Sequence, residues 1–507
     1  MGPIVLTIMD GWGIAKPNKG NAILLAKTPN LDKLQSKYSS TTLIASGSKV
    51  GLPVGQDGNS EAGHMNIGAG RIVEQDAVAI NHNIYDGTFY KNPAFMSAIN
   101  HVKNHNSKIH LMGLLTDGMS AHAFPDHLYA LLDLLSQKKI KKIYLHLFTD
   151  GRDSPQHEAI KYLRALIKSF KNGEKIATIT GRFYAMERNK RWGITKQAYE
   201  LLTLGKAKYQ AQDAIGAVLQ GYNRKNTDEF IEPTLIDKNG LIEENDSIIY
   251  FNLRSDRTRQ LTKAFVQKDF NKKNPGSFIR KKTFNNLLFI AMTDFGPDLD
   301  HILSAFPSQD ITQTLPKVLE NKKQLYISES EKYAHVTYFF NGGYADIVGG
   351  EDRSKIPSPD ICCYDKAPKM SAPNITKEVI NYLKKNKYDF YCINYANPDM
   401  VGHTGNLKAG IKACECVDTE IGKLYKEVSK KKGILIITSD HGNAEEMINL
   451  KTGEVDTKHS INSVPFIITI KNQKLRTNGF LGNIAPTVLD LFDIKKPKEM
   501  DCKSLLC

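Results

Sequence analysis

The sequence predicts an α/β protein with mainly parallel sheets, divided into two domains. Strand-like apolar runs alternate with amphipathic segments along nearly the whole chain, which is typical of this fold class. Many of these runs end directly in charged residues, and ligand sites in open α/β sheets lie at the carboxyl ends of strands. The chain has 507 residues, a length that suggests roughly two to four domains.

The expected strands are short runs rich in Ile, Leu and Val. In chain order they are Ile4–Met9, Ile109–Leu115, Ile143–Phe148, Ile176–Ile179, Ser247–Leu253, Leu287–Met292, His335–Phe340, Tyr388–Asn394, Gly433–Thr438 and Val464–Ile470. Helices are expected between them, because the leucines from Leu128 to Leu135 follow the spacing of one helix face. A similar face runs from Ile411 to Leu424, and residues 270–282 are expected to form a polar surface loop.

The formal net charge of +14 admits nucleic acid, an anionic membrane or an anionic substrate as a partner. Of the 13 arginines, ten fall between Arg152 and Arg280, whereas the lysines are scattered in short runs. Arginine has a planar fork that suits phosphate and carboxylate, while lysine is a strongly solvated point charge. The arginine-rich middle therefore favours a small anionic ligand over a nucleic-acid partner.

Membrane and secreted classes are not supported. A spanning helix needs roughly 20 apolar residues, and the longest clean runs are much shorter, such as Val464–Ile470. The N-terminus lacks the basic region and the cleavage site of a secretory signal. The seven cysteines are odd in number and contain no CxxC pair, so we expect reduced thiols in a cytoplasmic protein.

Four motifs predict a metal centre: TIMDGWG, ANPDMVGHTGN, TSDHGNAEE and DTKHSINSVPF. Carboxylate and imidazole ligands without thiolate suit Mn, Zn or Mg, and there are enough of them for two ions. A single Asp or His of this kind more often caps a helix or lies in a core, but four such motifs at strand ends favour metal binding. The candidate ligands are Asp10, Asp399, His403, Asp440, His441 and His459.

The candidate nucleophile is Ser60, in the glycine-rich segment GQDGNSEAGHMNIGAGR. A helix is expected to begin just after it, and free backbone N–H groups at a helix start suit an incoming phosphate. The Gly-x-Ser-x-Gly elbow of hydrolases is not present. A bound metal could instead lower the pKa of the hydroxyl, although a simple helix cap is the alternative for this serine taken alone.

The arginine-rich middle contains LHLFTDGRDSP, TITGRFYAMERNKRW and YFNLRSDRTRQ. Their arginines could clamp both the phosphate and the carboxylate of a small acid. Nucleotide motifs such as G-x-x-x-x-G-K-[ST] are not present. The candidate binding residues are Arg152, Asp153, Arg182, Arg188, Arg254 and Arg257, with His122 and Lys332 as further candidates.

Together with GNSEAGHMNIGAGR and EKYAHVTYFFNGG, these motifs resemble those of the cofactor-independent (2,3-bisphosphoglycerate-independent) phosphoglycerate mutases, of the alkaline phosphatase superfamily. The resemblance spans essentially the whole chain, with no departure at the motif positions. It implies a phosphatase-like α/β sandwich formed by both chain ends, residues 1–75 and 307–507. A transferase domain that binds the substrate would be inserted as residues 76–306.

The resemblance also implies an activity, the interconversion of 3-phosphoglycerate and 2-phosphoglycerate through a phosphoserine at Ser60. It implies two divalent ions, expected to be Mn²⁺, no requirement for 2,3-bisphosphoglycerate, closure between the domains, and a monomer. Asp153 would transfer protons to and from glycerate. One ion would bind Asp399, His403 and His459, and the other Asp10, Ser60, Asp440 and His441. His122, Arg152, Asp153, Arg182, Arg188, Arg254, Arg257 and Lys332 would hold the phosphoglycerate, with Ser60, Asp153 and Lys332 catalytic.

Two other functions remain open at this level. A metallophosphatase or another phosphosugar mutase of the same superfamily would share the metal motifs, and the arginine set is what argues against it. A basic nucleic-acid-binding protein would need a concentrated basic stripe with aromatic platforms.

Overall fold

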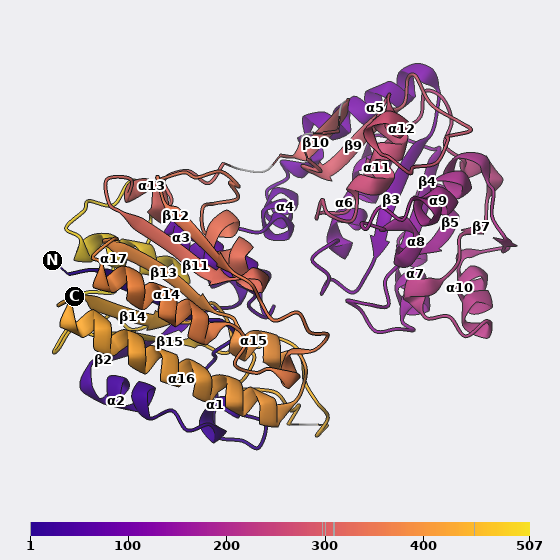
Figure 1. Cartoon of the computed structure of the whole chain (residues 1–507). Helices are drawn as coiled ribbons and strands as arrows, with labels where there is room; N and C mark the ends of the chain where they lie inside the picture. Colours follow the sequence, from indigo (N-terminus) through magenta and orange to yellow (C-terminus); the bar gives the residue numbers. More distant parts are fainter. Residues whose placement is uncertain (1, 297, 300, 308–309, 451) are drawn as a thin grey trace. The chain divides into compact units, whose positions relative to one another are not determined.

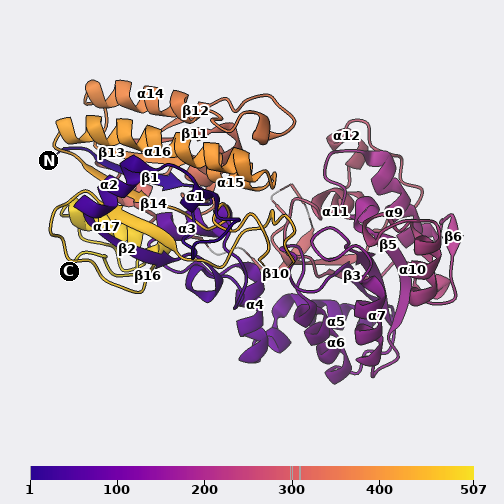
Figure 2. The ribbon, with the colours of Figure 1, turned by 90° about the horizontal axis from the view of Figure 1, so that it is seen from below.

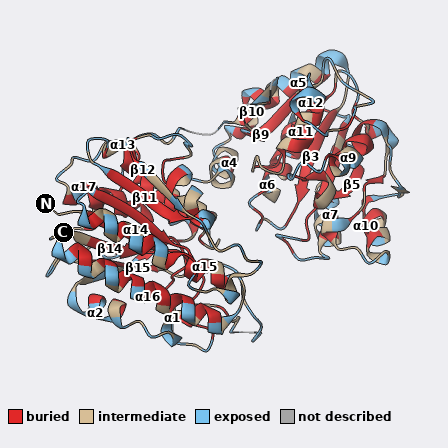
Figure 3. Cartoon of the chain, in the orientation of Figure 1, coloured by how far each residue is buried: buried red, intermediate tan, exposed pale blue. Residues whose placement is uncertain are grey.

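The structure, a computed structural model, describes residues 2–296, 298–299, 301–307, 310–450 and 452–507. The chain divides into unit 1, residues 1–75 and 310–507, and unit 2, residues 76–309. Both chain ends lie in unit 1 (Figure 1). Each unit is a largely parallel sheet covered by helices, and the central strands of each sheet are deeply buried (Figure 3). The predicted fold class, α/β with mainly parallel sheets, is confirmed.

The sheet of unit 1 centres on β1 (Ile4–Met9), whose alternate side chains enter two different cores. Ile4, Leu6 and Ile8 pack on one face, and Val5 and Met9 pack on the other. Because helices cover both faces, the strand is a continuous apolar run. In spatial order the described strands are β12 (Asp352–Ile356), β11 (Gln324–Glu329), β13 (Phe390–Tyr395), β1, β14 (Ile434–Thr438), β15 (Val464–Ile468), β2 (Ser39–Ile44) and β16 (Gly479–Phe480). Neighbours run parallel, except that β15 is antiparallel to β14 and β2.

Helices lie on both faces of this sheet. One face carries α1 (Ala22–Leu25), α2 (Pro29–Lys37), α14 (Ala372–Lys384) and α16 (Leu407–Lys430), and α14 and α16 lie side by side in Figure 2. The other face carries α3 (Ser60–Ala69), α13 (Leu315–Val318) and α17 (Ile484–Leu491). The short helix α15 (Asn397–Gly402) follows β13 and packs on α16.

The sheet of unit 2 follows the same plan around β3 (Ile109–Leu115). Ile109 and Leu111 face one core, and Met112 and Leu114 face the other. Its described strands lie in the order β10 (Ile302–Phe306), β9 (Leu288–Thr293), β8 (Ser247–Tyr250), β3, β4 (Ile143–Thr149), β5 (Lys175–Gly181), β7 (Thr234–Leu235) and β6 (Tyr209–Gln210). The β5–β7 pair is antiparallel and the other pairs are parallel.

Helices also cover both faces of this second sheet. One core takes side chains from α4 (Asp76–Tyr85), α5 (Pro93–His105), α6 (Pro125–Gln137), α7 (Ala159–Lys168) and α10 (Ala214–Asn223). The other takes them from α8 (Arg182–Ala185), α9 (Trp192–Leu204), α11 (Arg259–Val266) and α12 (Phe270–Lys273). Among the described residues, no helix is long and apolar enough to span a bilayer.

Two local predictions are wrong. Residues His335–Phe339 form a π-helical turn instead of a strand. Val336 and Phe340, four residues apart, face the same core beside α3, and this helical spacing outweighs the strand propensity of the run. Residues 270–282 are not a purely polar loop, because Phe270 and Phe278 are buried with their ring centroids 5.3 Å apart.

A chain of buried polar side chains crosses the sheet of unit 2. His110 on β3 lies 2.9 Å from Asp246 and 3.0 Å from His146 on β4, and His146 lies 3.0 Å from Thr178 on β5. Burial lowers the pKa of His110, against the opposing effect of Asp246. Burial, and then the neighbouring His110, lower the pKa of His146 well below its usual 6.5. Both rings are therefore held neutral in the folded unit.

We predict that unit 2 loses stability as the pH falls below 6.5, the ordinary histidine pKa. The unfolded chain binds protons there and the folded chain does not, so His146 alone costs about 1 kcal/mol between about pH 7 and about pH 5.5. The measurement is urea unfolding followed by Trp192 fluorescence in a Trp12→Phe background. His146→Gln should flatten this pH dependence, and the exposed-site control His105→Gln should not. Equal slopes in wild type and His146→Gln would contradict the prediction.

Candidate functional site

Acidic and histidine side chains gather where three neighbouring strands of unit 1 end. Asp10 follows β1, and Asp440 and His441 follow β14. Asp399 lies in α15, directly after β13. These strands are adjacent and parallel, with Met9 beside Tyr395 and Ile8 beside Thr438. The carboxyl ends of parallel strands meet at one edge of a sheet, so the order β13–β1–β14 brings the side chains together.

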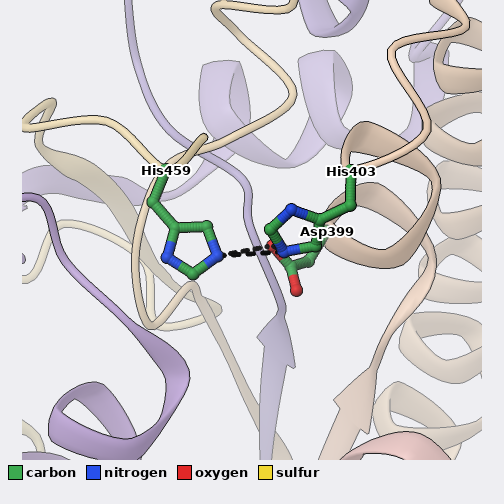
Figure 4. A group of neighbouring side chains, drawn as sticks. All are labelled: Asp399, His403 and His459. Carbon is green, nitrogen blue, oxygen red and sulfur yellow. Dashed lines mark hydrogen bonds and ion pairs between the residues drawn. The ribbon is translucent and has the colours of Figure 1, made fainter. Parts of the chain in front are cut away.

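Asp399, His403 and His459 form one compact group (Figure 4). The Nε2 atoms of both histidines lie 3.3 Å from Asp399 Oδ1 and 3.1 Å from each other. Asp399 and His403 are separated by one turn of α15, as their spacing predicts. His459 comes from the segment that precedes β15.

The two histidine rings of this group are oriented so that their Nε2 atoms can bind a cation. His403 Nδ1 donates to Thr457 O at 2.8 Å, and His459 Nδ1 donates to Gly58 O at 2.8 Å. In the neutral rings the two Nε2 atoms then carry lone pairs, which face each other beside a carboxylate oxygen. Lone pairs in this arrangement repel one another, and a divalent ion with O and N ligands would satisfy all three.

A second group surrounds Ser60, the first residue of α3. Ser60 Oγ lies 2.9 Å from His441 Nε2 and 3.3 Å from Asp10 Oδ1. His441 Nε2 is 3.5 Å from both Asp10 Oδ1 and Asp440 Oδ2. Asp440 Oδ2 is buried and accepts no hydrogen bond from the described residues, although His64 Nδ1 lies 3.3 Å away, so this oxygen has a lone pair to offer a cation.

Lys332 lies within the acidic group of unit 1. Its Nζ atom is 2.7 Å from Ser60 Oγ, 2.7 Å from Asp10 Oδ1 and 2.6 Å from Asp399 Oδ2. Burial lowers the pKa of the ammonium, but Asp10 and Asp399 outweigh burial and raise it, so the charge is retained. Lys332 therefore lies against the candidate nucleophile, and it belongs to a different unit from the arginines with which the resemblance groups it.

The buried carboxylates of this site have too few positively charged neighbours to neutralise them. Burial, and then repulsion from Asp440, raise the pKa of Asp10 to about 7 despite Lys332. Burial also opposes the charge on Asp440, but His441, His64 and Lys332 lower its pKa. A raised pKa at one acid of such a group indicates unbalanced negative charge, which bound cations would neutralise.

The start of α3 packs closely against the loop that carries Asp440. The N-cap residue Asn59 accepts a hydrogen bond from Ala62 N at 2.8 Å, which fixes the first turn. A Cβ atom at Gly63 would lie 2.6 Å from Asp440 O, so only glycine lets the helix pack against this loop. The N-terminal end of a helix carries a partial positive charge, which favours an anion at Ser60.

The sequence prediction did not include Glu445, which ties the surrounding loops together. It is fully buried, and its Oε2 accepts from Gly13 N at 3.1 Å and Asn443 N at 2.8 Å. Its Oε1 accepts from Asn462 Nδ2 at 3.0 Å and from Ser460 Oγ. One carboxylate thus joins the loops that carry Asp10, His441 and His459; only its place in the motif SDHGNAEE marked it.

In unit 2 the arginine cluster is built on acidic anchors. Arg182 Nη1 contacts Asp150 Oδ1 at 2.6 Å and Asp153 Oδ2 at 2.7 Å. Ser120 Oγ donates to the same Asp153 oxygen at 2.6 Å. Burial opposes the charge on Asp153, but Arg182 and its hydrogen bond lower the pKa, so Asp153 is held as a carboxylate.

A second anchor, Asp256, is also new. It lies 2.5 Å from Arg188, 3.9 Å from Arg254 and 4.0 Å from His122. Burial, and then Arg182, lower the pKa of His122 to about 4, so the ring is neutral. Asp256 lies between Arg254 and Arg257 in the predicted motif. The prediction omitted it because the spacing argument considered only the arginines.

The arginines are close enough to repel one another. Burial lowers the pKa of Arg257, and Arg188, Arg182 and Arg152 lower it further. The side chains of Arg152, Arg188 and Arg254 are between 41% and 54% exposed. The predicted residues of this segment, His122 and Asp153 with the five arginines, thus form one partly solvated, electropositive group that suits a small anion.

The comparisons with known proteins agree on one family. The family model described as the metalloenzyme superfamily matches residues 2–496. The chain is 48% identical to 2,3-bisphosphoglycerate-independent phosphoglycerate mutase 1 of Methanosarcina barkeri, over 99% of this chain and 98% of the relative. It is 45% identical to the 2,3-bisphosphoglycerate-independent phosphoglycerate mutase of Clostridium novyi, over 99% of both chains.

A solved structure is similar over the same length. The crystal structure of Leishmania mexicana phosphoglycerate mutase at low cobalt concentration has a TM-score of 0.77 and is 30% identical in sequence. The match covers 100% of this chain and 98% of that chain.

We predict that Glu445→Gln destabilises unit 1. A glutamine offers one acceptor oxygen, so its amide group would face donors at two of the four contacts, at a cost of roughly 3 kcal/mol. The free energy of unfolding by urea, followed by Trp12 fluorescence in a Trp192→Phe background, measures the loss. Glu454→Gln, an exposed site in the same region, is the matched control. A change below about 0.5 kcal/mol would show that Glu445 does not hold these loops.

Proposed function

Because this chain belongs to the 2,3-bisphosphoglycerate-independent phosphoglycerate mutases, within the metalloenzyme superfamily, we propose that it interconverts 3-phosphoglycerate and 2-phosphoglycerate without 2,3-bisphosphoglycerate. The proposal includes a divalent-metal requirement and a phosphoserine intermediate on Ser60. The observation that carries it is the setting of Ser60 Oγ, which lies at a helix start between Lys332 at 2.7 Å and His441 at 2.9 Å.

Ser60 is the attacking group in this proposal. Its Oγ atom forms a bond to phosphorus while the bond from phosphorus to the glycerate oxygen breaks, and the serine proton passes to Asp10, whose carboxylate keeps lone pairs besides the one that it would give to an ion. The Lys332 ammonium stabilises the serine oxygen as negative charge develops on it. The partial positive charge at the start of α3 would favour the negative charge of the phosphoryl oxygens.

We assign two divalent ions to the carboxylates and histidines of unit 1. Asp399, His403 and His459 would hold one, and Asp10, Ser60, Asp440 and His441 would hold the other. Mn²⁺ suits this set of O and N ligands. When bound, such ions lower the pKa of a serine hydroxyl and neutralise the oxygens of the transferring phosphoryl group. The facing lone pairs of His403 and His459 and the unpartnered Asp440 oxygen support the assignment.

The arginine cluster of unit 2 is assigned to the substrate. Arg152, Arg182, Arg188, Arg254 and Arg257 can supply paired N–H donors to a carboxylate and a phosphate. An acid with two anionic groups fits this cluster better than a simple phosphate ester does, which favours a mutase over a metallophosphatase. His122, neutral and close to Asp256, would donate or accept one further hydrogen bond.

Asp153 is assigned to proton transfer with the glycerate hydroxyls. Its Oδ2 atom is engaged by Ser120 and Arg182, so the other oxygen, Oδ1, would face the hydroxyl. A carboxylate held ionised beside glycerate can accept the proton of the 2-hydroxyl and pass it to the 3-oxygen that the first transfer releases. The 2-oxygen then takes the phosphoryl group back from Ser60, whose oxygen recovers the proton that it gave to Asp10. The reaction is then an isomerisation with no net gain or loss of protons.

The proposal also includes an oligomeric state and a cellular compartment. We propose that the protein acts as a monomer in the cytoplasm, with phosphoglycerate as its partner. The placement rests on the cysteines, which are all free in the structure, as reducing compartments keep them. Sedimentation at two protein concentrations tests the monomer.

Ser60→Ala is expected to lower the conversion of 3-phosphoglycerate by about 10⁴-fold or more, because no hydroxyl remains to accept the phosphoryl group. Binding of 3-phosphoglycerate, measured by calorimetry, should persist. Product analysis by ³¹P spectroscopy separates 2-phosphoglycerate from free phosphate, and free phosphate as the main wild-type product would favour the phosphatase alternative. Ser48→Ala, an exposed serine, is the control. Near-normal activity in Ser60→Ala would exclude the phosphoserine route.

Removal of metal by EDTA is expected to abolish activity, and Mn²⁺ is expected to restore it. Elemental analysis of the reloaded protein should give about two ions per chain, and about one in His459→Asn, because one ligand group is then broken. The exposed-site variant His105→Asn should retain both. Full activity after exhaustive chelation would contradict the metal assignment.

A further inference from the structure

His64 is a buried histidine that the proposed mechanism does not use. It lies on α3 one turn after Ser60, and none of its surface is exposed. Its Nδ1 atom is 2.9 Å from Ser60 O and 3.3 Å from Asp440 Oδ2. Its Nε2 atom is 3.0 Å from the side-chain amide of Asn394, at the end of β13. Both ring nitrogens therefore face atoms of the Ser60 site or their immediate support.

The neighbours determine which nitrogen carries the proton. Asn394 Nδ2 donates one hydrogen to Asp10 Oδ2 at 2.7 Å, and its second hydrogen points to His64 Nε2. Nε2 therefore accepts, and in the neutral ring the proton lies on Nδ1. That N–H group faces two acceptors, the carbonyl oxygen of Ser60 and the carboxylate of Asp440.

These bonds connect three parts of the site. The Nδ1–H group is hydrogen-bonded to Ser60 O, in the first turn of α3, and it lies 3.3 Å from the carboxylate of Asp440, which follows β14, so an electrostatic contact links the ring to that carboxylate. Asn394 joins the same ring to Asp10, which follows β1. A ring fixed at both nitrogens limits the rotation of both carboxylates, as hydrogen-bonding partners of metal ligands do.

We propose that His64, with Asn394, is a positioning residue that sets the Asp440 and Asp10 carboxylates relative to Ser60. This inference rests on the proposed function, because it takes those carboxylates as the metal ligands of a phosphoryl-transfer site. The competing role is that of a ligand, since Asp10, His64 and Asp440 offer atoms within 4.8 Å of one another. The nitrogen that faces Asp440 carries the proton, however, so it has no lone pair for an ion.

The test measures Mn²⁺ affinity of the metal-free protein by calorimetry, without phosphoglycerate. His64→Ala should weaken Mn²⁺ binding by about 10- to 100-fold. It should lower kcat by a similar factor while KM for 3-phosphoglycerate stays within about twofold, because the arginines that bind the substrate lie in unit 2. Asn394→Leu should weaken Mn²⁺ binding in the same direction, and it serves as a second variant if His64→Ala does not fold.

The conservative variant separates positioning from ligation. Asn66, on the same helix, donates its amide to Ala62 O four residues earlier at 2.8 Å. His64→Asn can make the equivalent bond to Ser60 O while facing Asp440, so it should recover Mn²⁺ affinity to within about threefold of wild type. His127→Gln replaces an equally buried histidine of unit 2 and should leave Mn²⁺ affinity unchanged, whatever its effect on thermal stability.

Three outcomes would overturn the inference. They are unchanged Mn²⁺ affinity in His64→Ala, failure of His64→Asn to recover affinity, and loss of one whole ion from His64→Ala by elemental analysis, which would make His64 a ligand. The proposed function fails separately. If the His64 variants change Mn²⁺ affinity as expected but the wild-type protein does not isomerise 3-phosphoglycerate, the proposed function is refuted and the positioning role is intact.

Discussion

The electrostatic attraction between one buried ammonium group and the carboxylates around it is the interaction on which the site of unit 1 depends. Lys332 Nζ contacts Asp10 and Asp399 at 2.7 and 2.6 Å, with Asp440 close by. Buried charges are costly unless they are paired, and one cation cannot balance three acids. Burial, and then repulsion from Asp440, raise the pKa of Asp10 to about 7, and the negative charge that Lys332 leaves unbalanced makes this edge of the sheet a place for cations.

The rest of unit 1 serves to hold that charge distribution in place. The order β13–β1–β14 brings Asp10, near the N-terminus, next to Asp399 and Asp440, which follow it by more than 380 residues. Glu445 fixes the loops around them by accepting four hydrogen bonds. Helix α3 brings Ser60 against the acids because Gly63 allows contact with the backbone of Asp440. A nucleophile is thus held next to both an ammonium group and several anions.

Unit 2 has the opposite charge imbalance, an excess of positive charge, on a similar sheet. Its clustered arginines outnumber their acidic partners, and burial, followed by the like charge of the neighbouring arginines, lowers the pKa of Arg257. Asp150, Asp153 and Asp256 orient several guanidinium groups without neutralising the whole cluster. The formal charge of +14 for the chain conceals this division, because the two local charge excesses have opposite signs.

The sequence by itself determined the fold class, most of the core strands, although not β11, and the residue types of both clusters. Ile4–Met9 is recognisable because a strand buried on both faces is apolar at every position, apart from Thr7. Tertiary structure decided which strand ends are neighbours, that His335–Phe339 is helical, and that Lys332 lies among acids. It alone distinguished His64 and Glu445 from ordinary core residues. The local sequence pattern indicates which side chains of a segment are buried. The partner of a buried charge depends on which distant segments the fold brings together, and the local pattern does not contain that information.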